Sequence, residues 1–114
     1  MKVANRDARP FVQKLHPFKG NNLEGTYWCA NPSSIDPGDS GYAVLSYGYW
    51  PLFVCIHLEG ADVWFENKDR YSVTTSKHRT QSHPHQPTQP LTNAETKLLI
   101  AKGYTALVKE RITV

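Results

Sequence analysis

The segment from residue 70 to residue 87 carries the side chains best suited to binding chemistry. Its sequence, RYSVTTSKHRTQSHPHQP, combines hydroxyl, amide, imidazole and cationic groups with at most two apolar side chains, Tyr71 and Val73. Hydroxyl and guanidinium donors suit contacts with phosphate or with backbone oxygen atoms. The candidate binding residues are Tyr71, Thr74, Thr75, Ser76, Lys77, His78, Arg79 and Gln81.

Three interpretations of this segment remain open. Any hydroxyl of residues 74–76 could cap a short helical turn over residues 77–81, which would carry the basic side chains. Tyr71, Trp64 and Trp50 are nearby in sequence and could stack on unpaired bases, which favours nucleic acid as the partner. The same surface could bind a protein, or the hydroxyls could satisfy the backbone of a purely structural loop.

The histidines of this segment also invite a zinc hypothesis, with His78, His83 and His85 joined by Cys29 or Cys55. Zinc requires three or four ligands in a fixed tetrahedron. The spacings match no familiar zinc finger, and the chain has no Cys-x-x-Cys pair. We therefore expect no metal site.

The sequence Gly-Asp-Ser-Gly around Ser40 surrounds the nucleophile in some serine hydrolases. Such a nucleophile needs a histidine base and an orienting acid held in a larger scaffold. Here His16 is the only histidine before the motif, and the flanking Gly and Pro residues are typical of a turn. The chain also has no glycine-rich phosphate loop or dinucleotide fingerprint. The sequence thus predicts a non-enzyme without a cofactor.

Length and composition indicate one globular domain. The chain has 114 residues, 39% of them hydrophobic, and no apolar stretch long enough to span a membrane. The polar, basic N-terminus lacks the apolar run of a secretion signal, so we expect a cytoplasmic protein with no membrane contact. In that compartment Cys29 and Cys55 are expected to be buried free thiols.

Charge is distributed unevenly along the chain. Residues 1–20 carry five Lys or Arg and one Asp, whereas residues 21–66 carry six acids and no Lys or Arg. This asymmetry could mark an electrostatic binding surface, or could follow from acids in the turns between strands.

These side chains must be positioned by a small α+β fold. Residues 23–30, 42–48, 51–58 and 63–66 have the composition of strands and are separated by turn residues, which predicts an antiparallel meander. We expect a sheet of four to five strands packed against one C-terminal helix. Residues 1–22 would form a basic arm or short helix, and residues 23–114 a single domain, with exposed edge strands that allow a homodimer.

The strongest helix signal covers residues 92–102. Thr92 and Glu95 have the spacing of a capping box, and Gly103 stands where a helix would end in the left-handed conformation. The predicted apolar face contains Ala94, Leu98 and Ala101, with Leu99 beside it. The proline-rich residues 82–90 are expected to be an extended connector, and the tail after Gly103 a strand, favoured by its last residues RITV, or a second short helix.

Residues 41–84 resemble a family of small, uncharacterised proteins encoded by bacteriophages, prophages and plasmids. The resemblance rests on the order SYG, PLFV, WFEN and RYSVTTSKH, followed by Gln81 and Pro84. It implies the context of a mobile element, in which small proteins often bind host machinery, including restriction and CRISPR defences, or handle nucleic acid. We therefore expect a non-catalytic accessory protein that binds a host macromolecule, with direct nucleic-acid binding through residues 70–84 as the alternative.

Overall fold

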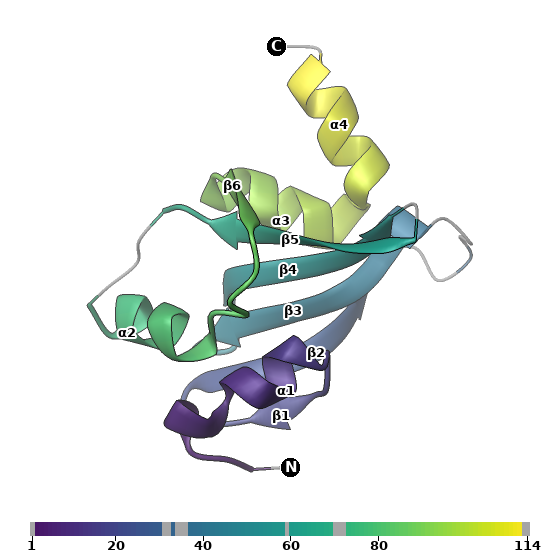
Figure 1. Cartoon of the computed structure of the whole chain (residues 1–114). Coiled ribbons are helices and arrows are strands. Elements are labelled where there is room, and N and C mark those ends of the chain that lie inside the picture. Colours follow the sequence, from purple (N-terminus) through teal and green to yellow (C-terminus); the bar gives the residue numbers. More distant parts are fainter. Residues whose placement is uncertain (1, 31–32, 34–36, 59, 70–72, 113–114) are drawn as a thin grey trace.

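The computed structural model describes residues 2–30, 33, 37–58, 60–69 and 73–112 (Figure 1). These residues form an α+β fold around a six-stranded sheet with the order β1-β2-β3-β4-β5-β6. Neighbouring strands are antiparallel except for β5 and β6, which are parallel. The strands are β1 Phe18–Lys19, β2 Leu23–Cys29, β3 Ser40–Ser46, β4 Trp50–Leu58, β5 Ala61–Asn67 and β6 Thr88–Leu91. The helices are α1 Arg9–Gln13, α2 Val73–Ser82, α3 Asn93–Lys102 and α4 Tyr104–Ile112, with short 3₁₀ turns η1 Asn5–Asp7 and η2 Pro37–Asp39.

The meander predicted from β2 to β5 is confirmed, and β4 lies near its centre. Residues 51–56 of this strand are all buried, as its continuous apolar sequence indicated. Phe53 and Cys55 belong to one hydrophobic core, whereas Val54 and Ile56 belong to a second core on the opposite face of the sheet. A strand that is apolar on both sides requires a covering layer on both sides.

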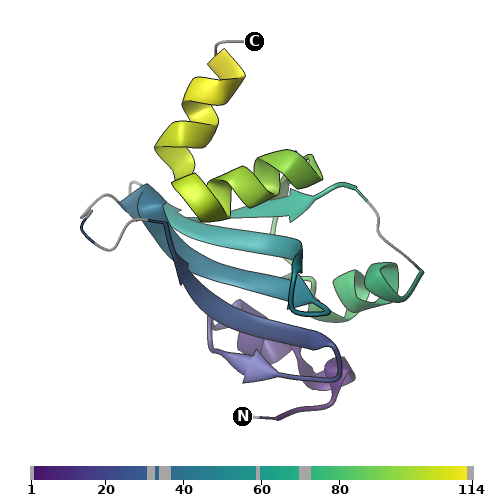
Figure 2. The same ribbon diagram turned by 180° about the vertical axis from the view of Figure 1, so that it is seen from behind.

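The expectation of one helix on one face is therefore wrong. Helices α3 and α4 cover one face of the sheet, and α1 and α2 cover part of the other (Figures 1 and 2). Residues Ala8 and Val12, around α1, are fully buried, so the N-terminal segment contributes to the core of the domain.

The sheet has six strands because both of its edges are extended by short segments. Strand β1 pairs with β2 through Phe18 and Gly25. Strand β6 comes from the end of the proline-rich connector, which is extended as predicted and pairs in parallel with β5. Pro90 is tolerated there because an edge strand needs hydrogen bonds on one side only.

Helix α3 begins where its sequence predicts, but the side of the helix that is buried differs from the predicted apolar face. Both hydrogen bonds of the capping box between Thr92 and Glu95 are present, and Gly103 ends the helix at φ 91° and ψ 170°, which is not the left-handed helical conformation that we expected. The buried residues are Thr96 and Leu99, whereas Ala94 and Ala101 of the predicted face are exposed. The bulkier side chain of Leu99 fills the core, and the two alanines have little surface to bury.

The chain after Gly103 forms helix α4, not the strand that RITV favoured. Leu107 packs into the same core as Leu99, and the ring centroid of Tyr104 lies 5.9 Å from that of Phe65. The far end of α4 projects away from the rest of the domain in both views (Figures 1 and 2). No described helix is long and apolar enough to cross a membrane.

Candidate binding surface around helix α2

Helix α2 is longer than the short turn predicted from the sequence. It runs from Val73 to Ser82, so Thr74, Thr75 and Ser76 lie inside the helix and do not cap a turn that begins after them. Tyr71 and the side chains of Thr74 and Thr75 lie outside the described part of the chain. The binding roles predicted for these three residues therefore stay predictions.

One side of α2 is buried against the sheet. His78 is only 4% exposed, which contradicts its expected place on the exposed surface. Its Nδ1 atom lies 2.8 Å from the hydroxyl of Ser46, a buried residue at the end of β3. The hydroxyl of Ser82, also buried, donates to the carbonyl of His78 at 2.8 Å. Because the sheet presents a hydroxyl here, the covering helix needs a polar partner such as imidazole.

Burial also determines the charge of His78. Its pKa is lowered from the ordinary value of 6.5, first by burial and then by the neighbouring ammonium group of Lys77. A lowered pKa keeps the imidazole neutral at physiological pH. His78 therefore positions α2 on β3 and does not add positive charge to the surface.

The opposite side of α2 faces solvent. Lys77 and Thr80 are exposed, while Ser76, Arg79 and Gln81 are partly buried. The hydroxyl of Thr80 donates to the carbonyl of Ser76 at 3.2 Å, whereas the buried Oε1 of Gln81 has no hydrogen-bond partner among the described residues. Of the predicted set, Lys77 is therefore exposed, Ser76, Arg79 and Gln81 are partly buried, and His78 is buried.

Arg79 joins α2 to strand β5. Its Nη1 donates to the carbonyl of Asn67 at 2.9 Å and lies 3.4 Å from Oε2 of Glu66. The other carboxylate oxygen of Glu66 accepts a hydrogen bond from the hydroxyl of Thr88 at 2.9 Å. The side chain of Arg79 is largely buried, so its attraction to Glu66 is less screened by water than that of an exposed pair, and desolvation of the two charges offsets part of it.

Arg9, which the sequence analysis did not select, holds the C-terminal end of α2. From α1 it donates through Nε to the carbonyl of His83 at 2.8 Å and through Nη2 to the carbonyl of Thr80 at 2.6 Å. The carbonyls at a helix C-terminus lack intrahelical donors and carry partial negative charge, so a guanidinium group stabilises them. Gln13 of the same helix donates to the carbonyl of Pro84 at 3.1 Å.

His83 is fixed in one neutral form by its neighbours. Its Nδ1 accepts the backbone N–H of His85 at 2.9 Å, so the proton of the neutral ring lies on Nε2, which is 3.8 Å from Oε1 of Glu66. Burial, the largest cause, lowers its pKa, and the carboxylate of Glu66 acts in the opposite direction. The ring also packs edge-on against Phe53, with the centroids 5.3 Å apart. Only Nδ1 of the ring is hydrogen-bonded among the described residues, and Nε2 points toward Glu66 at the edge of the same group of side chains.

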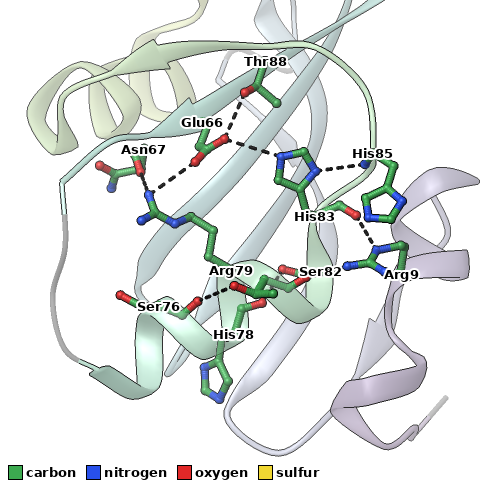
Figure 3. Close-up of polar contacts among 11 residues, drawn as sticks. Arg9, Glu66, Asn67, Ser76, His78, Arg79, Ser82, His83, His85 and Thr88 are labelled. Carbon is green, nitrogen blue, oxygen red and sulfur yellow. Dashed lines mark hydrogen bonds and ion pairs between the residues drawn. The ribbon is translucent and has the colours of Figure 1, made fainter.

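These side chains surround an open hollow of about 380 Å³ between α1, β5, α2 and the segment before β6 (Figure 3). In the same view His78 points away from this hollow. Two guanidinium groups and one carboxylate line it, so its net charge is positive, and it suits an anion. We call it the arginine hollow; its lining residues are Arg9, Glu66, Arg79, Thr80, His83 and His85.

Two of the aromatic residues proposed for base stacking are not available on the surface as expected. Trp64 is 2% exposed and belongs to the core, and Trp50 is partly buried with the ammonium of Lys97 5.9 Å from its ring centroid. Exposed aromatic side chains lie instead in the turn between β3 and β4, where Tyr47 is 37% and Tyr49 is 51% exposed. The ring of Tyr47 lies beside His78 of α2, whereas Tyr49 lines a hollow with Lys97 and Ile100 of α3. The sequence Tyr-Gly-Tyr at residues 47–49 could have indicated an exposed aromatic turn, because glycine between two tyrosines is typical of a turn.

Ser40 of the Gly-Asp-Ser-Gly motif lines a second hollow, of about 400 Å³. This hollow includes Tyr42 and Cys55, which belong to the core on the sheet face that α1 and α2 partly cover. Ser40, Cys55, His57 and Asp62 all line it, and Nδ1 of His57 lies 3.0 Å from Oδ1 of Asp62. No hydrogen bond joins Ser40 to His57 among these described residues, and burial raises the pKa of the Cys55 thiol to about 12. The hollow therefore brings a hydroxyl, a thiol, an imidazole and a carboxylate together, with only the last two in direct contact among the described residues.

The two cysteines are free, and they differ in exposure. Cys55 is buried, as expected, whereas Cys29 at the end of β2 is exposed. Within the described residues, no group of three or more His, Cys, Asp or Glu side chains could hold a metal ion.

Comparison with protein-family models, with curated proteins and with solved structures gives no significant match.

Proposed function

We propose that the protein is a non-catalytic accessory protein of the phage or mobile-element type, and that the host macromolecule it binds is nucleic acid. The binding surface would be the arginine hollow together with the exposed side of α2. The resemblance of residues 41–84 to a family encoded by mobile elements supports this context, in which such proteins include inhibitors of restriction or CRISPR defence.

The observation that carries the proposal is the convergence of two arginines on one open hollow. Arg9 and Arg79 are 70 positions apart in sequence, yet both line the arginine hollow. Arg9 contacts backbone carbonyls, so its described hydrogen bonds leave its charge without a carboxylate partner. A guanidinium group has five N–H donors, and the described bonds of Arg9 use two of them. The other donors can bind phosphate oxygen atoms, which makes the hollow suited to the backbone of a nucleic acid.

The exposed side of α2 extends this positive surface. Lys77 is exposed on the helix, and His85 is exposed at the rim of the hollow. Hydroxyl groups also contact phosphates in protein–nucleic acid complexes, and Thr80 lines the same hollow. Glu66 is the one acid there, and its carboxylate is already occupied by Arg79 and Thr88.

A series of substitutions that remove side-chain cations and hydrogen-bond donors tests the proposal. The double variant Lys77→Gln with His85→Gln changes two exposed side chains and should preserve the fold. Binding of a labelled single strand of about 12 nucleotides, measured by fluorescence anisotropy at low salt, should weaken at least about fivefold, because phosphate contacts are lost. Arg9→Gln should weaken it further, and Arg9→Lys less.

The matched control is Lys102→Gln, which removes one exposed lysine from the end of α3 on the other face of the sheet. We expect it to bind as the wild-type protein does. Absence of binding by the wild-type protein, or an equal loss in Lys102→Gln, would contradict the proposal.

A further inference from the structure

The turn between β3 and β4 exposes two tyrosines, Tyr47 and Tyr49. Tyr47 is one of four described residues other than glycine at positive φ, at 57°, and Gly48 follows at 78°. Such backbone angles are unfavourable for a bulky residue, and Asn or Gly is the usual choice at this place in a hairpin. A strained, exposed aromatic residue points to a functional constraint.

Both tyrosines lie beside lysines. Tyr47 and Gly48 line a hollow of about 490 Å³ together with Lys2, Lys19 and the acid Glu24. Tyr49 lines a smaller hollow of about 260 Å³ on the other side of the turn, with Lys97 at its rim. Each exposed ring is therefore next to at least one ammonium group.

This turn is also adjacent to α2. The ring centroid of Tyr47 lies 5.8 Å from that of His78, and the preceding residue of α2, Lys77, is exposed. The buried contact between His78 and Ser46 fixes the helix against the strand that leads into the turn. Tyr47 thus lies beside α2, whereas Tyr49 lies beside α3 on the other side of the turn.

We propose that Tyr47 and Tyr49, one on each side of the turn, form a stacking platform for unpaired bases. Lys2 and Lys19 in the hollow of Tyr47, and Lys97 in the hollow of Tyr49, would contact the adjacent phosphates. The platform makes the protein selective for single strands over duplexes, because bases in a duplex are already stacked on one another. Aromatic rings flanked by cations are the usual combination in sites for single-stranded nucleic acid. This inference rests on the proposed function, since it names the form of nucleic acid that the surface takes.

The test compares one single strand of about 12 nucleotides with its duplex by fluorescence anisotropy at low salt. Wild-type protein should bind the single strand at least about tenfold more tightly. Tyr49→Leu, which keeps an apolar side chain and removes the ring, should lose most of this preference, whereas Tyr49→Phe should retain it. The matched control is Tyr27→Leu, because Tyr27 is 61% exposed and lies away from the turn, beside the hollow of Ser40.

The outcomes separate this inference from the proposed function. Equal binding of strand and duplex, or a preference unchanged in Tyr49→Leu, would overturn the stacking platform while salt-sensitive binding at the arginine hollow still stood. Absence of binding to either form would overturn both. A loss in Tyr27→Leu as large as that in Tyr49→Leu would also contradict the platform, because it would mean that any exposed tyrosine has the same effect.

Discussion

Helices α2 and α3 have ten residues each and cover opposite faces of the same sheet, but they are held there by different forces. Helix α3 buries Leu99 in an apolar core and begins with a complete capping box. Helix α2 buries His78 and Ser82, which contact the sheet and the helix backbone through hydrogen bonds.

The difference explains why only one of these helices carries a candidate binding surface. An apolar side chain such as Leu99 holds its helix in place by packing into the core and requires no hydrogen-bond partner. The anchors of α2 are polar and reach it from distant segments, through Ser46 of β3 and Arg9 of α1. A helix held in this way can keep cations and hydroxyls on its outer side, because its position does not depend on an apolar stripe.

The largest effect that we expect comes from breaking the apolar anchor. Leu99→Ala should lower the free energy of unfolding by about 2–5 kcal/mol, because it removes buried methyl groups and leaves a cavity. Urea denaturation followed by circular dichroism measures this loss. Leu98→Ala, at a partly buried position of the same helix, should cost clearly less. Equal losses in the two variants would show that Leu99 is not the anchor.

Breaking the polar anchor should have a smaller and more local effect. Ser46→Ala leaves Nδ1 of His78 buried without its partner, which should cost about 1–3 kcal/mol. Amide hydrogen exchange should show that α2 loses protection while α3 keeps most of its own. Thr80→Ala, on the exposed side of α2, serves as the control. A uniform loss across both helices would contradict separate anchoring.

The smallest effect should appear in the pH dependence of stability. Burial lowers the pKa of both His78 and His83 in the folded protein. Below the ordinary pKa of about 6.5 the unfolded chain binds protons that the folded chain does not, so stability should fall as the pH drops through this range. Thermal unfolding between about pH 7 and pH 5 measures the slope. His78→Gln should flatten it, and an unchanged slope would exclude His78 as its source.

The sequence alone predicts the parts of the fold that depend on neighbouring residues. Strands β2 to β5 follow from apolar runs separated by turn residues, and the start of α3 follows from Thr92 and Glu95. Helix α4 was only the second alternative for the tail, because the residues RITV favour a strand locally. Its core residue Leu107, which packs with Leu99, outweighs that preference.

The candidate site is harder to predict because its geometry depends on contacts between distant segments. Lys77 and Arg79 were selected from their own chemistry, and the structure places Lys77 on the exposed side of α2 and Arg79 at the arginine hollow. Nothing in the local sequence indicates that Ser46 would bury His78, or that Arg9 would reach the end of α2. Such pairs become visible only when the sheet order and the path of α1 are known.

The central claim is that the surface around α2 binds the phosphate backbone of nucleic acid. The most direct test is the affinity of the wild-type protein for one labelled single strand at about 50 and about 200 mM salt, because each phosphate contact releases counterions. We predict tight binding at low salt that falls steeply at high salt, with a shallower slope in the Lys77→Gln and His85→Gln double variant. An affinity that does not change with salt, or no binding at either concentration, would contradict the account.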